Sequence, residues 1–232
     1  MIERYTLTVP PNKLAERFAI QLPESHTPRY NAGPAQLLPV ITSTAPQGIS
    51  IFYWGTSPEW AKNKALSERI INARVETIRE KPNMQKTLMK SRCIIPADSF
   101  YAWRKAGKKT QIPYRFVTTN QDIFSFAGLW EEFEDTDGNS FHTFAIITVP
   151  ANPIVASVHD RMPAILSKQT EALWLNPNAS ADDLINTLEA YPENKMNLYT
   201  ISPRISDLRI DVPSLISPAP ASDQFGNLTL FD

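Results

Sequence analysis

The chain has 232 residues, of which 42% are hydrophobic and 20% are charged. These proportions are ordinary for a globular protein, and the length suits one large domain or two small ones with a sizeable core. Lys and Arg number 23 against 24 Asp and Glu, so the sequence lacks the overall basic charge of general nucleic-acid binders. A local basic patch is still compatible with this balance.

The single cysteine, Cys93, excludes a disulfide within the chain and a multi-cysteine zinc site. It stands in the run Cys-Ile-Ile and is expected to be a small buried residue. The start of the sequence lacks the apolar run of a signal peptide, and no apolar stretch reaches the length of a membrane span. The expected location is the cytoplasm, with no membrane partner.

In the first half of the chain, strands are predicted over 38–42 and 49–54, and helices over 58–71 and 84–89. A longer extended run is predicted over 93–103. Ala45-Pro46-Gln47-Gly48 is turn-like and is expected to join the two strands. Pro96 is expected to interrupt the extended run.

In the second half, strands are predicted over 114–118, 123–130 and 141–149, and helices over 167–175 and 180–190. Asp137-Gly138 is a hairpin signal between the second and third strands. Ser167 and Ser180 are expected to cap the two helices. The Pro- and Ser-rich end, 213–232, is expected to be a loosely attached C-terminal strap.

The strands are not separated by regularly alternating helices, and the pattern therefore predicts an α+β fold. The sequence shows neither an internal repeat nor a linker, so a single domain over 1–232 is expected.

Several enzyme classes lack their motifs here. The sequence has no Gly-rich phosphate loop, Rossmann fingerprint, His-Glu-x-x-His zinc motif or Gly-x-Ser-x-Gly elbow. The histidines, His26, His142 and His159, stand far apart and without the acidic or thiol neighbours of a metal site. We therefore expect no metal and no cofactor.

The segment His159-Asp160-Arg161-Met162-Pro163 places a charged group between two apolar stretches. Asp and Arg are rarely buried unless they pair, and histidine is the usual general acid or base near neutral pH. The segment is expected to belong to a functional site. The alternative is a surface turn with a satisfied histidine.

Asn72-Ala73-Arg74 is a second polar segment, and an extended backbone would put Asn72 and Arg74 on one face. Asn72 offers a donor and an acceptor, and the Arg74 fork suits phosphate or carboxylate. The alternative is a surface loop with an Arg–Glu pair. Trp103 beside Arg104 has the composition that stacks on unpaired bases, although a single aromatic residue is more often part of a core.

Seven segments in order resemble the SOS-response-associated peptidase (SRAP) family, also described as abasic-site processing or shielding proteins. They are Arg4-Tyr5-Thr6-Leu7, Arg29-Tyr30-Asn31-Ala32-Gly33-Pro34, Trp54-Gly55, Ile71-Asn72-Ala73-Arg74-Val75-Glu76-Thr77, Arg92-Cys93-Ile94-Ile95-Pro96-Ala97-Asp98, Phe126-Ala127-Gly128-Leu129-Trp130-Glu131 and His159-Asp160-Arg161-Met162-Pro163. The resemblance implies one α+β domain around a distorted antiparallel β-barrel, with a positively charged groove for single-stranded DNA.

The resemblance also implies roles for individual residues. Phosphate contacts are expected from Arg4, Arg74 and Arg161. Stacking on bases, or wedging between them, is expected from Trp60, Trp103 and Pro34. The catalytic pocket of the family would be lined here by Asn72 and His159.

The chain departs from the family at two catalytic positions. The family begins Met-Cys-Gly-Arg, and after Met removal the amine and thiol of that Cys capture the aldehyde of a ring-opened abasic sugar as a thiazolidine. Here Ile2 and Glu3 follow Met1, and Ala102 stands where the family usually has Glu. Without the thiol no thiazolidine can form, and the bulky Ile2 is expected to keep Met1 in place.

Three functions remain open. The first is a monomeric protein of the DNA-damage (SOS) response that binds single-stranded or junction DNA at abasic sites without capturing it. The second is an enzyme with residual Schiff-base lyase activity through the Met1 amine and His159. The third is a pseudoenzyme whose groove serves a protein partner. A peptidase is the least supported, because nothing marks Cys93 as an activated thiol.

Overall fold

The computed structural model describes residues 2–21, 27–55, 71–107, 110–134 and 139–228. Its strands are β1 (Tyr5–Leu7), β2 (Arg29–Ala32), β3 (Leu37–Thr42), β4 (Ala45–Trp54), β5 (Asn72–Arg74), β6 (Arg92–Ala97), β7 (Ser99–Lys105), β8 (Gln111–Thr118), β9 (Phe124–Glu134), β10 (Ser140–Pro150), β11 (Arg161–Pro163), β12 (Ile165–Leu166) and β13 (Met196–Thr200). Its helices are α1 (Pro11–Phe18), α3 (Val75–Glu80), α4 (Pro82–Lys90), α5 (Pro153–Ala156), α6 (Lys168–Leu175) and α7 (Ala181–Asn186), with 3-10 turns η2 (Glu193–Lys195), η3 (Pro203–Ser206) and η4 (Pro213–Ile216).

Five strands close into a barrel. β10 pairs with β4, β4 with β3, β3 with β6, β6 with β9, and β9 again with β10. Every pair in this ring is antiparallel except β4–β10, which is parallel. The α+β fold with a distorted β-barrel core is thus confirmed.

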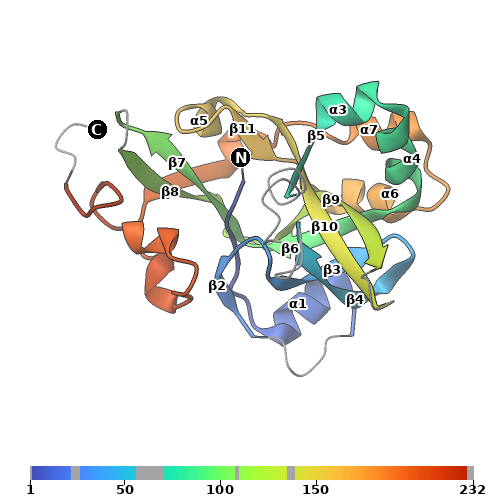
Figure 1. The fold of residues 1–232 in the computed structure, drawn as a ribbon, viewed down its shortest axis with the longest axis horizontal. Helices are drawn as coiled ribbons and strands as arrows, with labels where there is room; N and C mark the ends of the chain where they lie inside the picture. Colours follow the sequence, from blue (N-terminus) through green and yellow to red (C-terminus); the bar gives the residue numbers. More distant parts are fainter. Residues whose placement is uncertain (1, 22–26, 56–70, 108–109, 135–138, 229–232) are drawn as a thin grey trace.

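A second sheet, in the order β13-β8-β7-β1-β2, extends beside the barrel. Figure 1 shows α3, α4, α6 and α7 gathered at the opposite end of the molecule, with α1 below the barrel. None of the helices described is long and apolar enough to cross a membrane. The two sheets leave the first residues of the chain at the junction between them, beside β11 (Figure 1).

Aromatic residues fill the junction between the sheets. Tyr5 lies 5.4 Å from Trp54 and 5.8 Å from Phe126, measured between ring centroids, in the tilted and edge-on arrangements that aromatic pairs favour. Gly128 on β9 allows close approach, because a Cβ there would collide with the Ile95 side chain of β6. The start of the chain is therefore built into the core.

The strand predictions are confirmed, with shifted ends. The turn prediction at Ala45–Gly48 is wrong, because the turn is Ser43-Thr44 and β4 already begins at Ala45. The extended run breaks at Asp98, between β6 and β7, and Pro96 lies inside β6. The predicted helix 58–71 (except its last residue) and Asp137-Gly138 lie outside the described residues.

Helix predictions are mixed. Ser167 caps α6 as predicted, accepting the Thr170 N–H at 3.2 Å, and Ser180 caps α7 in the same way. The helix predicted to reach 190 ends earlier, at Asn186. Three of the helices that the structure describes, α1, α3 and the short α5, were not predicted.

The described part of the C-terminal segment packs on the second sheet. Leu215 of η4 is buried with Tyr101 and Ile205, and the Ala219 N–H donates to the Thr200 carbonyl at 3.0 Å. Upstream of the segment, the Asp211 carboxylate accepts the backbone N–H of Tyr30 at 2.6 Å. These contacts attach the C-terminal part of the chain to β2 and to β13, the two edge strands of the sheet.

Candidate functional site

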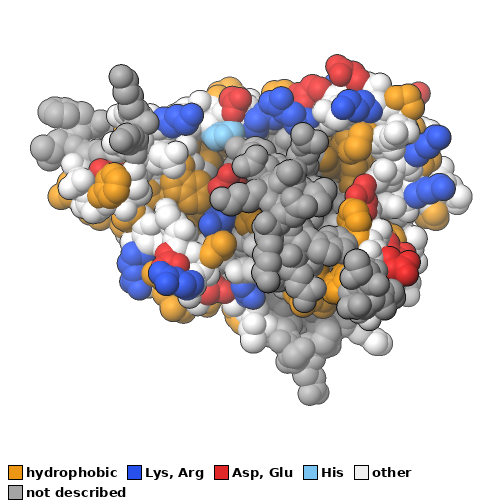
Figure 2. Space-filling model, in the orientation of Figure 1, with side chains coloured by type: hydrophobic (Ala, Val, Ile, Leu, Met, Phe, Trp, Pro, Cys, Tyr) orange, Lys and Arg blue, Asp and Glu red, His pale blue; other side chains and the backbone are white. Residues whose placement is uncertain are grey.

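A cavity of about 410 Å³ opens where the chain begins. Residues from the N-terminal segment, β7, β8, the α5–β11 connection and η3 line it: Glu3, Arg4, Trp103, Lys105, Gln111, His159 and Ser206. Three residues predicted from distant parts of the sequence, Arg4, Trp103 and His159, therefore meet in one cavity. Figure 2 shows Lys and Arg side chains on both sides of a histidine on this face of the molecule.

The His159 ring has two competing contacts. Its Nδ1 accepts the Arg161 N–H at 3.0 Å and also lies 3.0 Å from an Asp160 carboxylate oxygen. The first contact requires an unprotonated Nδ1 and the second a protonated one. Burial lowers the pKa of His159, against the opposing effect of Asp160. The neutral ring is therefore the favoured form at neutral pH, and its proton is on Nε2 when Nδ1 accepts the Arg161 N–H.

The two positions that differ from the family are both apolar and buried. Ile2 is 0% exposed and Ala102 is 1% exposed. The Asn72 side chain donates from Nδ2 to the Ile2 carbonyl at 2.8 Å, which fixes the start of the chain to β5. Neither side chain offers a nucleophile or an acid to the cavity beside them.

Asn72 and Arg74 lie on β5, which confirms the predicted extended backbone. Both border a second cavity of about 370 Å³ between β5, β9, β10, α3 and α4. Arg74 is exposed, whereas Asn72 reaches from this cavity to Ile2. The structure thus divides the predicted site residues between two cavities, with Asn72 and Arg74 at one and Arg4, Trp103 and His159 at the other.

Arg161 is buried, and its guanidinium is already paired. It donates to both carboxylate oxygens of Glu76, at 2.6 and 3.0 Å, and to the Thr148 carbonyl at 2.6 Å. The Arg161 hydrogen bonds hold the pKa of Glu76 below its usual range. This bidentate pair fixes α3 to β10 and β11. A phosphate contact by Arg161 stays a prediction and would require the guanidinium to leave Glu76.

Pro34 lies in the turn after β2. At the preceding Gly33 a Cβ would stand 3.3 Å from Arg4 Nη1 and would collide with Leu208. Glycine at position 33 therefore lets this turn approach Arg4 and Leu208 closely. Trp60, also predicted to contact DNA, lies outside the described residues.

Cys93 is buried as expected. Burial raises the pKa of its thiol, which keeps the sulfur protonated and unreactive. No cluster of three or more His, Cys, Asp or Glu that could hold a metal occurs in the part of the chain that the structure describes.

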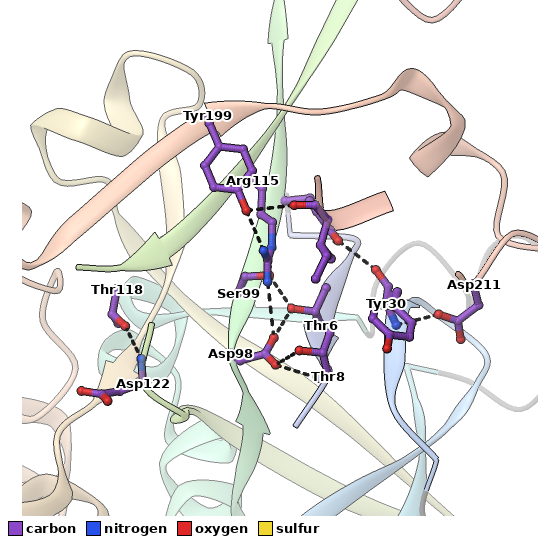
Figure 3. A network of polar contacts seen from close by, with 12 residues as sticks. Thr6, Thr8, Tyr30, Asp98, Ser99, Arg115, Thr118, Asp122, Tyr199 and Asp211 are labelled. Atoms are coloured by element: carbon purple, nitrogen blue, oxygen red, sulfur yellow. Dashed lines mark hydrogen bonds and ion pairs between the residues drawn. The ribbon is translucent and has the colours of Figure 1, made fainter. Parts of the chain in front are cut away.

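A buried polar network holds β1 against β7 (Figure 3). The Asp98 carboxylate accepts the Thr8 N–H and the Thr8 hydroxyl, each at 2.6 Å, and also the Thr6 hydroxyl. Arg115 Nη2 lies 3.8 Å from Asp98 Oδ1, and Arg115 Nε donates to the Ser99 hydroxyl at 2.8 Å. The network fixes the strand that delivers Glu3 and Arg4 to the cavity.

Sequence reasoning missed four lining residues, Glu3, Lys105, Gln111 and Ser206. Glu3 carried a signal, because it stands where the family pattern has Gly. Ser206 carried no sequence signal, since it comes from the 3-10 turn η3, about two hundred residues along the chain from Glu3.

Comparisons with known proteins identify the family of the chain. The family described as SOS response associated peptidase (SRAP) matches residues 1–208. The chain is 39% identical over 221 residues to "Abasic site processing protein YoqW" of Bacillus subtilis, covering 93% of this chain and 99% of that protein. It is 26% identical over 236 residues to "Abasic site processing protein HMCES" of Mus musculus, covering 85% and 67%.

Solved structures of other proteins have the same fold as this chain. A crystal structure of a protein from Bacteroides thetaiotaomicron superposes with a TM-score of 0.82 at 29% identity, covering 93% of this chain and 99% of that one. A protein from Bordetella bronchiseptica, at 23% identity and a TM-score of 0.71, shares the fold. The chain belongs to the SOS response associated peptidase (SRAP) family.

Proposed function

We propose that this protein binds single-stranded or junction DNA at abasic sites without forming a thiazolidine crosslink. One observation carries the proposal: the two catalytic positions are the buried, apolar Ile2 and Ala102, while the cavity beside them remains open and holds His159 and Arg4. Relatives named abasic site processing proteins support DNA as the ligand. The protein would act as a cytoplasmic monomer in the DNA-damage response.

The side chains divide into phosphate contacts and base contacts. Arg4 is half-buried and lines the cavity, so its guanidinium would contact a phosphate there. Arg74 is exposed and would track the backbone. Trp103 would stack on a base. Pro34 and Trp60 would act as wedges, and Asn72 and His159 would line the pocket for the abasic sugar.

Replacing Arg74 by Ala is expected to weaken binding to abasic and intact single strands alike. Each phosphate contact adds about one unit or less to the slope of log affinity against log salt, so the variant should show a slope smaller by about 0.7. Fluorescence anisotropy from about 50 to 200 mM salt measures it. Arg79→Ala, at the exposed end of α3, removes the same charge and should leave the slope nearly unchanged.

Wild-type protein incubated with abasic single-stranded DNA tests the proposal itself. We expect salt-sensitive binding and no adduct that survives heating in detergent. A heat-stable adduct would contradict the proposal. A species trapped only by borohydride would instead favour the Schiff-base lyase through the Met1 amine, and absence of binding at low salt would favour a protein partner.

A further inference from the structure

Glu3 is the one acidic side chain among the described residues that line the His159 cavity. Burial lowers the pKa of both His159 and Arg4, and the Glu3 carboxylate opposes this shift in each, so its charge lies within electrostatic reach of both groups. Glu3 is exposed, and its carboxylate has no hydrogen bond or ion pair in the buried networks formed by the described residues. A negative charge in a cavity that would receive DNA opposes phosphate, which calls for a different partner.

The backbone pairing between β1 and β7 brings Glu3 near Ala102, the position at which the family usually has Glu. Tyr5 pairs with Phe100 in the antiparallel β1–β7 ladder. The Tyr101 N–H donates to the Arg4 carbonyl at 3.1 Å, which extends this pairing toward the N-terminus. Glu3 precedes Arg4 and Ala102 follows Tyr101, so both residues lie one position beyond this last hydrogen bond between the two segments.

We propose that Glu3 provides the carboxylate of this cavity and accepts a hydrogen bond from the C1′ hydroxyl of the closed abasic sugar. The inference rests on the proposed function and names the form of the ligand. An abasic deoxyribose exists mainly as a cyclic hemiacetal, with a C1′ hydroxyl where the base was. Ile2 has no thiol to trap the open-chain aldehyde, so the closed sugar is the form that the cavity has to recognise.

The chemistry of the cavity suits that hydroxyl. An ionised carboxylate only accepts hydrogen bonds, so it attracts a sugar O–H and repels a phosphate. Hydrogen bonds to a charged group are the stronger class. The neutral His159 ring, with its proton on Nε2, can donate to a sugar oxygen from the same cavity. Arg4 lies close enough to Glu3 to offset part of its repulsion toward the DNA backbone.

The test compares three single strands of one sequence. They carry a natural abasic site, its tetrahydrofuran analogue without the C1′ hydroxyl, or an intact nucleotide. We expect the full-length protein to bind the natural site about tenfold more tightly than the analogue, which is the size of one charge-assisted hydrogen bond. Glu3→Ala should bring this ratio to about one, and Glu3→Gln to an intermediate value.

Glu16→Ala is the matched control, because Glu16 is an exposed carboxylate on α1 and its loss changes the net charge equally. It should keep the tenfold ratio. A wild-type ratio near one, or a ratio that Glu3→Ala leaves intact, overturns the inference but not the proposed function, provided that abasic strands still bind. Failure to bind any of the three strands overturns both.

Discussion

Ile2→Cys combined with Ala102→Glu is expected to turn reversible binding of abasic DNA into covalent capture. A small residue at position 2 allows removal of Met1, which leaves an amine and a thiol on one residue. The amine condenses with the sugar aldehyde with loss of water, and the thiol adds to the resulting C=N bond to close a thiazolidine. A denaturing gel should show a heat-stable adduct that the wild type never forms.

The single variants separate the two groups. Ile2→Cys alone should capture DNA about a hundredfold more slowly than the double variant, because it lacks a positioned proton-transfer group at position 102. Ile2→Ser is the matched control: it frees the same amine without a thiol and should give only a borohydride-dependent adduct. If the double variant is folded, has lost Met1 and still forms no adduct, the cavity does not hold the sugar as we describe.

Asp98→Asn is expected to destabilise the protein by about 3 kcal/mol, the cost of breaking a buried charge network on one side. The Asn amide would face the Thr8 N–H with a donor, and the buried Arg115 would lose its nearest carboxylate. Because the network fixes β1, DNA affinity should fall as well. Urea unfolding followed by tryptophan fluorescence measures the free energy of unfolding.

Asp182→Asn makes the same chemical change at an exposed position in the first turn of α7 and should alter the free energy of unfolding by about 0.5 kcal/mol or less. An Asp98→Asn variant as stable as this control would show that the Asp98 contacts contribute little. The strand carrying Glu3 and Arg4 would then need another explanation for its position.

Local signals in the sequence predict local structure well. Ser167 caps α6 because its hydroxyl accepts an N–H three residues on, an interaction that depends only on neighbours. Pro46 to Gly48 imitate a turn, yet pairing of β3 with β4 from Thr42 and Ala45 onward makes them strand. Helix α1 was missed because it is only eight residues long, so its apolar side is limited to Leu14, Ala15 and Phe18.

Contacts between residues far apart in the sequence could not be predicted from local patterns. Arg161 looked like a phosphate contact, but its partner Glu76 lies 85 residues away along the chain. The neighbourhood of His159 was predicted only through the family resemblance, since no local pattern links it to Arg4 or Trp103. The place of Glu3 in the same cavity as His159 is likewise visible only in the folded chain.

Intact-mass spectrometry of the purified wild-type protein, before and after incubation with abasic single-stranded DNA, tests whether the protein binds abasic sites without capturing them. We expect a mass that includes Met1 and is unchanged by the DNA under denaturing conditions, although the same mixture shows binding in native anisotropy. A denaturation-resistant increase equal to the mass of the DNA strand less one water would contradict it, because the chain would then capture abasic sites without the thiol at position 2.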